Sequence, residues 1–330
     1  MSALQKATRE PLIDALRALA LIGVVVVNLY GYPAAPQRFA VLDADPAATF
    51  LDCLLDSLVG ALLIAKAYPV LTFLFGYSLV LADRRGTKSR TRLTRLAWLG
   101  VAHGALLYFG DILLPYAVAG WWATRLLRQR LASLKSQLIA WVFVAVVITV
   151  ILMLLAVVFP AETRTSATST FADANGWRAW STLNVTTWLV TVFSSLLMVP
   201  QLMVLMLLGV FAARLRVLTH RRWQPPLQRW AGRTLVVAAL ANGAMALCLV
   251  LPATQALGLN HWAATLTWPI GPVMGLAAMA YAASRWRGQH SAALLSLAAL
   301  GRHTLSLYLA HSIVAVLVLN RDRGVSYMFL

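Results

Sequence analysis

One uninterrupted apolar segment constrains the fold of this chain more than any other feature. Residues 138–159 read LIAWVFVAVVITVILMLLAVVF and contain no charged side chain. A helix needs about 20 such residues to cross the hydrocarbon core of a bilayer. Across the chain 60% of the residues are hydrophobic and 12% are charged, whereas soluble domains carry about 25% charged residues. The sequence therefore predicts an all-α, polytopic transmembrane bundle.

Eight further apolar segments accompany this one, and together they predict about 9–11 membrane helices in a single integral membrane domain, 1–330. One of them contains Pro269 and Pro272, and we expect these prolines to break the helix after Trp268. Broken helices at membrane depth usually line a cavity. The predicted spans lie near 13–31, 50–82, 94–110, 112–127, 138–159, 183–213, 234–252, 264–284 and 304–320.

The formal net charge of +17 is concentrated between the apolar segments. Basic residues gather in four clusters, at 84–95, 125–135, 214–233 and 285–302. The alternate loops are nearly free of them, since 33–48 contains only Arg38 and 253–267 contains neither lysine nor arginine. This positive-inside pattern places the N-terminus and the basic clusters in the cytoplasm, facing anionic lipid head groups. We therefore expect a multi-pass protein of the inner (plasma) membrane, with membrane lipids and no nucleic acid as partners.

Two predicted spans, 50–82 and 183–213, are too long for one straight crossing. The first contains Lys66 in its middle, and the second contains Pro200. We expect each to consist of a short helix joined to a spanning helix. An ionisable side chain inside a membrane is costly and is a candidate for function, so Lys66 is a candidate substrate-binding residue.

The first apolar helix carries three polar residues, Asp14, Arg17 and Asn28. Eleven residues separate Arg17 from Asn28, which returns the helix to nearly the same face about 16 Å further along its axis. One face therefore offers a cation near one membrane surface and an amide near the other. We predict that all three residues bind substrate.

Two histidines lie in the middle of predicted spans. His103 precedes Asp111 by eight residues, and on an ideal helix the two side chains would be about 80° and about 12 Å apart, which is no ready-made dyad. Gly110, between them, could bend the chain. His311 follows Tyr308 by one turn, and Arg302 lies at the cytoplasmic end of the same span. A histidine in this position either bonds to a neighbouring helix or acts as a general base. We predict catalytic roles for His103, Asp111 and His311, and substrate binding by Arg302 and Tyr308.

The sequence contains no metal-site or cofactor motif. Its two cysteines, Cys53 and Cys248, both lie in apolar segments, which argues against a disulfide framework and against a zinc site. We expect no metal and no tightly bound cofactor.

Several motifs together resemble the YeiB-like family of bacterial inner-membrane proteins, a domain of unknown function. The family pattern LDxLRGxALLGILLxN is similar to IDALRALALIGVVVVN here, and an F-x-x-LFG segment corresponds to LTFLFG at 71–76. A HGxLxxxGDILxxYxxxG pattern matches residues 103–120, and GRxxLxxYLxxS matches residues 301–312. The family typically continues into further helices and a GPxEWxxR ending. This sequence reaches Leu330 without them, so the resemblance leads us to expect that it lacks the C-terminal part of the family, either naturally or by truncation.

The YeiB-like family in turn resembles the transmembrane acyltransferases, which transfer acyl groups to sugars, lipids or amines. One group of these carries an Arg-x10-His motif in its first helix, and here the same spacing reads Arg17-x10-Asn28. The position is kept but the base is absent, so the resemblance implies that a catalytic base must come from elsewhere. A YLxH sequence in the last span, here Tyr308 to His311, is also similar to that group.

The leading hypothesis is therefore a membrane acyltransferase with an acyl-CoA-like co-substrate entering from the cytoplasm. Arg17 and the basic loops suit its phosphates. His103, or failing that His311, would take the proton of a sugar, lipid or small-molecule acceptor, Asp111 would orient that histidine, and Asn28 would hold the acceptor or stabilise the oxyanion. The alternative hypothesis is a transporter or flippase for an amphipathic or lipid-linked small molecule, with the same polar residues as substrate or proton sites. The sequence leaves the oligomeric state open.

Overall fold

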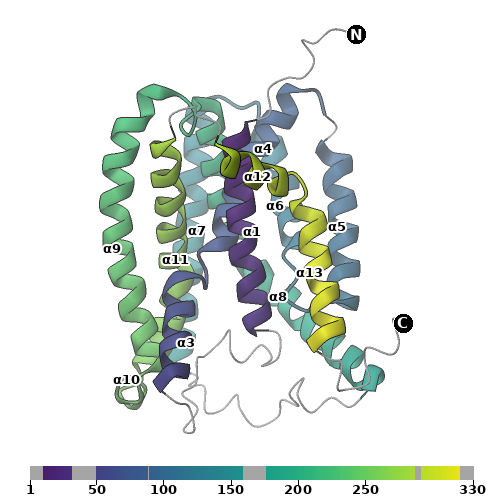
Figure 1. The fold of residues 1–330 in the computed structure, drawn as a ribbon, viewed down its shortest axis with the longest axis vertical. Coiled ribbons are helices and arrows are strands. Elements are labelled where there is room, and N and C mark those ends of the chain that lie inside the picture. Colours follow the sequence, from purple (N-terminus) through teal and green to yellow (C-terminus); the bar gives the residue numbers. More distant parts are fainter. Residues whose placement is uncertain (1–9, 32–49, 88, 159–175, 287–290, 320–330) are drawn as a thin grey trace.

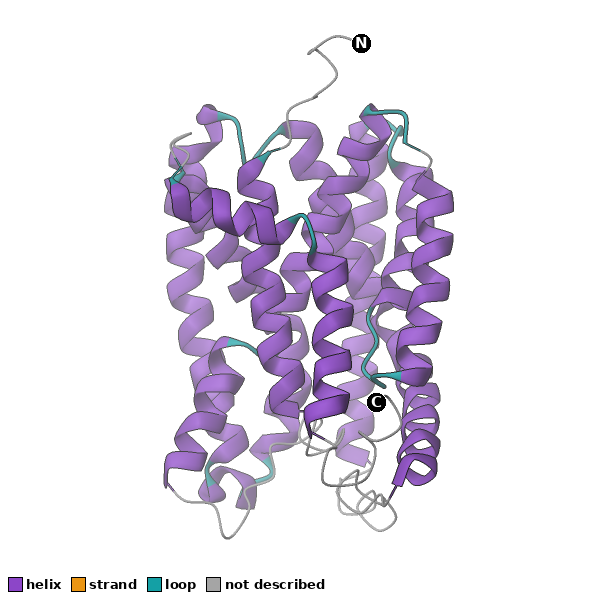
Figure 2. Cartoon of the chain, turned by 45° about the vertical axis from the view of Figure 1, so that its right-hand side comes forward, coloured by secondary structure: helices purple, strands orange, loops and turns teal. Residues whose placement is uncertain are grey.

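The computed structural model describes residues 10–31, 50–87, 89–158, 176–286 and 291–319, and within these ranges all regular structure is helical. Most of the helices run along the long axis of the molecule and pack side by side as a bundle (Figures 1 and 2). The prediction of an all-α, polytopic bundle is confirmed. The helices are α1 (Pro11–Gly31), α3 (Phe50–Leu62), α4 (Ala67–Arg84), α5 (Ser89–Leu106), α6 (Leu113–Leu126), α7 (Leu131–Val158), α8 (Gly176–Leu215), α9 (Gln224–Val250), α10 (Pro252–Ala256), α11 (Leu259–Arg285), α12 (Ala292–Gly301) and α13 (Thr304–Leu319), with a 3₁₀ turn at Arg221–Trp223.

Within the described ranges, six helices are long and apolar enough to cross a membrane, and the bent pair α12–α13 would make a seventh. This number is smaller than predicted because α5 and α6 do not pass the same test. The α6 helix has only 14 residues, and α5 begins with the basic sequence SRTRLTR. Both nevertheless belong to the bundle and pack against each other, with α5 at its right-hand edge in Figure 1.

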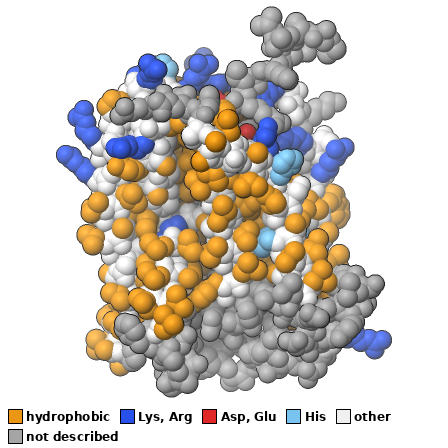
Figure 3. Space-filling view, viewed as in Figure 1, with side chains coloured by type: hydrophobic (Ala, Val, Ile, Leu, Met, Phe, Trp, Pro, Cys, Tyr) orange, Lys and Arg blue, Asp and Glu red, His pale blue; other side chains and the backbone are white. Residues whose placement is uncertain are grey.

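The outer surface of the bundle is apolar at mid-height. Figure 3 shows hydrophobic side chains over the middle of the visible face, with many basic side chains at the end where α1 begins. Helix α7 is the extreme case, because none of its apolar window is buried inside the protein. Burying apolar area stabilises by about 25 cal/mol per Å² removed from water, so these surfaces require a lipid environment. The protein is a membrane protein.

The centre of the bundle is the contact between α4 and α8. A Cβ atom added at Gly76 of α4 would lie 2.0 Å from the carbonyl oxygen of Met206, and one added at Gly209 of α8 would lie 1.9 Å from that of Phe73. The two backbones therefore touch through two glycines, as small residues allow between membrane helices.

The predicted interruption of 50–82 is confirmed. Helix α3 ends at Leu62 and α4 begins at Ala67, and the turn between them places Ala65 at a φ of 61°. The Lys66 ammonium is buried and donates to the carbonyl oxygen of Gly60 at 2.7 Å. A cation is favourable there because the last carbonyls of a helix carry partial negative charge.

Two other predicted interruptions are wrong. Helix α8 continues through Pro200 over 40 residues, and α11 continues through Pro269 and Pro272. A proline in a helix leaves the carbonyl four residues earlier without its N–H partner. For Pro272 that carbonyl belongs to Trp268, and the side-chain amide of Gln201 in α8 donates to it instead. A neighbouring helix thus supplies the missing donor, which keeps α11 continuous.

Candidate functional site

The turn between α5 and α6 builds the centre of the site. Helix α5 ends at Leu106, and the carbonyl of His103 accepts the N–H groups of Leu107 and Tyr108 at 2.9 and 3.0 Å. The chain then reverses and brings Asp111 back to His103, with 2.9 Å between Nδ1 and Oδ1. The expectation of two side chains about 12 Å apart was wrong, because the helix ends before it reaches Asp111.

The carboxylate of Asp111 is held at the start of α6. Its Oδ2 atom accepts the N–H of Leu114 at 3.0 Å, in the first turn of that helix, where the exposed N–H groups favour a negative charge. Gly100 makes room for it, since an added Cβ there would lie 2.9 Å from Oδ2 and 2.6 Å from the amide nitrogen of Leu114. The side chains of His103 and Asp111 are both 0% exposed.

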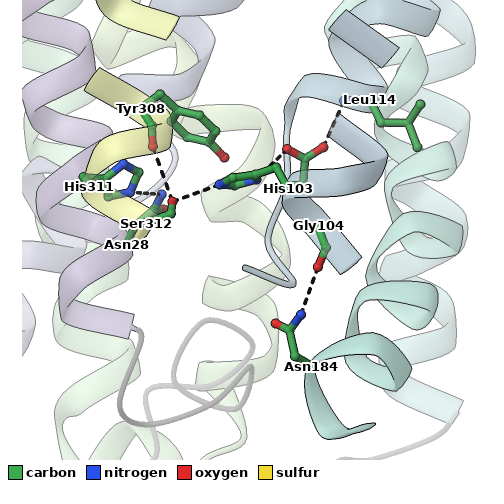
Figure 4. A network of polar contacts seen from close by, with 9 residues as sticks. Asn28, His103, Gly104, Leu114, Asn184, Tyr308, His311 and Ser312 are labelled. Atoms are coloured by element: carbon green, nitrogen blue, oxygen red, sulfur yellow. Dashed lines mark hydrogen bonds and ion pairs between the residues drawn. The ribbon is translucent and has the colours of Figure 1, made fainter. Parts of the chain in front are cut away.

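Ser312 of α13 completes a chain of three side chains. The Nε2 atom of His103 lies 2.9 Å from the Ser312 hydroxyl oxygen (Figure 4). With an ionised Asp111, which can only accept, Nδ1 of His103 carries the proton of their bond, and in the neutral ring Nε2 is the atom that can accept from the hydroxyl of Ser312. This order of carboxylate, imidazole and hydroxyl activates a hydroxyl oxygen as a nucleophile in other folds. We call these residues the Asp111–His103–Ser312 chain.

His311 lies beside this chain. Its Nε2 atom accepts from the side-chain amide of Asn28 at 3.2 Å, which ties α13 to the far end of α1. The ring of Tyr308 lies between the two histidines, with centroid distances of 5.0 Å to His103 and 5.2 Å to His311. The structure thus gathers residues from α1, α5, α13 and the start of α6 around Tyr308 (Figure 4).

Asn184 of α8 fixes the end of α5. Its side-chain amide donates to the carbonyl oxygens of Gly104 and Ala105 at 3.0 and 2.9 Å (Figure 4). These carbonyls belong to the last turn of α5, which lacks helical N–H partners. The position of His103 is therefore set from three sides, by α6, α8 and α13.

A cavity of about 660 Å³ extends from the basic end of the bundle to Tyr308. It lies among α1, α4, α5, α6 and the bend between α12 and α13, and its inner part is apolar, with Leu21, Leu71 and Ile112 in its wall. Two carboxylates, of Glu10 and Asp14, also line it. Five arginines line the cavity: Arg17, Arg85, Arg92, Arg95 and Arg302. The result is a cationic entrance above an apolar interior.

Two predicted binding residues, Arg17 and Arg302, lie in this cavity wall. The Arg17 guanidinium donates to the Asp14 carboxylate and to the Ser78 hydroxyl. Arg302 is placed beside them because α12 rests on α1 at Gly301, where an added Cβ would lie 1.7 Å from the carbonyl oxygen of Asp14. A glycine is therefore needed at the position before Arg302.

The predicted site residues fall into three groups. Asp14, Arg17, Arg302 and Tyr308 line the cavity, while His103, Asp111, His311 and Asn28 meet beyond Tyr308. Lys66 belongs to neither group and contacts Gly60 in its own segment. Ser312, Ser78 and Asn184 belong to the contacts of this site but were not predicted to do so, although Ser312 is the last position of the GRxxLxxYLxxS pattern.

The fold and the site define a class: a polytopic helical membrane protein with a basic cavity that leads to a buried carboxylate–imidazole–hydroxyl chain. Residues 212–324 match a family described as "Protein of unknown function (DUF418)". The chain is also 32% identical over 164 residues to "Uncharacterized protein YeiB" of Escherichia coli (strain K12), a match that covers 47% of this chain and 40% of that protein. The resemblance to the YeiB-like family of unknown function is confirmed.

The matched region spans less than half the length of that relative. No solved structure matches the chain. The family match at 212–324 includes Arg302, Tyr308, His311 and Ser312, but His103 and Asp111 lie outside it.

Proposed function

We propose that the protein is a membrane acyltransferase that moves an acyl group from an acyl-CoA-like donor to a hydroxyl or amine acceptor. The observation that carries the proposal is the position of Tyr308. It forms the inner wall of the arginine-lined cavity and also packs against His103, so a donor bound in the cavity would end next to an imidazole oriented by a carboxylate.

The cavity suits an anionic head with an apolar tail. Its five arginines outnumber its two carboxylates, which favours phosphate groups at the entrance. Its interior beyond Arg17 is apolar and suits an acyl chain or the arm that carries it. Ligand cavities commonly measure about 300–1,000 Å³, and the 660 Å³ here lie within that range. By the positive-inside pattern the entrance faces the cytoplasm of the inner membrane, where acyl thioesters are available.

In the proposed reaction His103 removes the proton of the attacking hydroxyl or amine through Nε2. Asp111 keeps the imidazole in the tautomer that leaves Nε2 free to accept, and it stabilises the imidazolium that forms. The Tyr308 hydroxyl lies at the end of the cavity and can donate to the carbonyl oxygen of the donor as negative charge develops there. His311 and Asn28 lie on the far side of Tyr308, toward the outer surface, and would contact the acceptor, a sugar, lipid or small molecule.

The test is transfer of label from radioactive acetyl-CoA to a cell-envelope extract by the purified protein in lipid nanodiscs. We expect transfer by the wild type and a loss of about 100-fold or more in His103→Ala, the range for removal of a general base. His303→Ala is the control histidine variant, because His303 is exposed in the turn between α12 and α13 and should keep its activity. Absence of transfer by the wild type, or full transfer by His103→Ala, would contradict the proposal.

One observation favours the second candidate, a transporter for an amphipathic molecule. The α3–α4 interruption places a buried lysine within a predicted span, and transporters commonly use interrupted helices at their binding sites. Uptake of a labelled amphiphile into proteoliposomes, lost in Lys66→Met and kept in His103→Ala, would support transport instead of acyl transfer.

A further inference from the structure

We propose that Ser312 is a nucleophile that carries the acyl group as a covalent ester between donor and acceptor. The inference rests on the proposed acyl transfer and adds a second chemical step to it. Direct transfer from donor to acceptor would need only His103 as the base. A covalent mechanism also needs a nucleophilic side chain that is hydrogen-bonded to the imidazole of His103.

The contacts of Ser312 are those of an activated hydroxyl. Its oxygen lies 2.9 Å from Nε2 of His103, while Nδ1 of the same ring lies 2.9 Å from Asp111. The base is thus within reach of the nucleophile and is oriented by a third group, which is the recurring arrangement of serine nucleophiles. The Ser312 residue is 1% exposed, so water does not compete for the hydroxyl.

A serine inside a membrane helix commonly bonds the carbonyl four residues earlier, and Ser312 does contact the carbonyl oxygen of Tyr308 at 3.3 Å. The contact with His103 is shorter by 0.4 Å, from 3.3 to 2.9 Å. The backbone contact alone would satisfy a purely structural serine. The additional imidazole, itself fixed by a buried carboxylate, distinguishes Ser312 from the other helical serines of the described segments.

Access to Ser312 passes Tyr308, which precedes it by one helical turn. The Tyr308 ring closes the inner end of the cavity and packs on His103. The Tyr308 hydroxyl is buried beside the backbone of Ile112 and forms no hydrogen bond of good geometry within the described ranges. A rotation of this side chain would open the cavity to the Ser312 hydroxyl.

The two steps balance without any further reactant. Ser312 Oγ attacks the thioester carbonyl carbon, His103 Nε2 takes the hydroxyl proton, and the carbon–sulfur bond breaks as His103 protonates the leaving thiolate. The acceptor oxygen or nitrogen then attacks the ester carbon, and His103 takes its proton. The ester bond to Ser312 breaks, and the proton returns to Ser312 Oγ.

The experiment incubates the wild-type protein in nanodiscs with radioactive acetyl-CoA and no acceptor, and then quenches it in acid. Trypsin releases a peptide of residues 303–321, in which tandem mass spectrometry locates the acetyl group. We expect one acetyl group on Ser312, a burst of free thiol equal to the enzyme, and loss of both in Ser312→Ala and His103→Ala. Ser306→Ala is the matched control, because Ser306 lies in the same peptide and is exposed.

Ser312→Cys keeps a nucleophile at this position and covers the case in which the alanine variant does not fold. We expect it to form an adduct that hydroxylamine releases readily, as a thioester requires. Transfer to the envelope extract with no adduct on the wild type, or undiminished transfer by Ser312→Ala, would overturn the role of Ser312 and leave the acyltransferase proposal intact. A wild type with neither adduct nor transfer would overturn both.

Discussion

Two interruptions of helical structure hold ionisable side chains inside this bundle, and they differ in how those side chains are paired. At the α5–α6 turn, His103 contacts a carboxylate through one nitrogen and a hydroxyl through the other. At the α3–α4 turn, the hydrogen bond of the Lys66 ammonium goes to a backbone carbonyl of its own segment. The first arrangement can move a proton between side chains, whereas the second stabilises the end of a helix.

The comparison shows that burial by itself does not identify a functional residue in a membrane protein. Both His103 and Lys66 are buried, and each is an ionisable residue within a predicted span. Their hydrogen-bond partners distinguish them. His103 lies between a carboxylate and a hydroxyl and can therefore pass a proton, whereas the partner of Lys66 is a backbone carbonyl, which cannot take part in general acid–base chemistry. Lys66 also lies outside the lining of the arginine-rich cavity, whereas the Tyr308 contact links His103 to it.

The largest effect is expected for Asp111→Asn. The asparagine amide would donate to Nδ1 of His103, leave the proton on Nε2 and remove the acceptor that the reaction needs. We expect acyl transfer to fall by about 100-fold or more while the thermal unfolding temperature changes little. The measurement is the pH–rate profile of transfer beside an unfolding curve in detergent. A wild-type rate of transfer in Asp111→Asn would show that the carboxylate at the α5–α6 turn has no more effect on the reaction than the carbonyl that binds Lys66 at the α3–α4 turn.

A smaller effect is expected for Gly76→Ala at the α4–α8 contact. The added Cβ would lie 2.0 Å from the carbonyl oxygen of Met206, so the two helices must separate. Such overpacking typically costs about 1–3 kcal/mol, visible as a lower midpoint of unfolding. Gly243→Ala is the control, because no heavy atom lies within 4 Å of its added Cβ, and it should gain about 0.5–1 kcal/mol. Equal midpoints for the two variants would show that α4 and α8 are not in close contact.

The smallest effect is expected for Lys66→Met, which keeps the length of the side chain and removes its charge. Replacing the ammonium by an apolar group removes the cost of keeping a charge out of water, and the lost contact with Gly60 is one hydrogen bond, with a net contribution of about 1.5–3 kcal/mol for a charged donor. These terms oppose each other, so stability and acyl transfer should both stay close to wild type. A complete loss of acyl transfer in this variant would place Lys66 in the reaction and break the comparison.

The sequence predicted much of the helical framework correctly. The apolar segments fix where helices can cross a membrane, and the lysine within 50–82 correctly marked the turn between α3 and α4. The prolines misled, because Gln201 of α8 supplies the donor that Pro272 lacks, and a partner from another helix leaves no local signal. The ideal-helix distance between His103 and Asp111 was wrong for a related reason, since it assumed that α5 continues through the turn at 107–112.

The sequence by itself determined that this chain is a helical membrane protein, because apolar length and charge placement are local properties that the bilayer imposes on each segment. It also identified Arg17, His103, Asp111, Tyr308 and His311 as candidate functional residues, because they are polar side chains within apolar segments. Only the tertiary structure decided which of them act together, because their contacts join residues up to 283 positions apart, as between Asn28 and His311. The packing of α13 against α5 likewise brought in Ser312, 209 residues from His103, which no spacing in the sequence could connect to it.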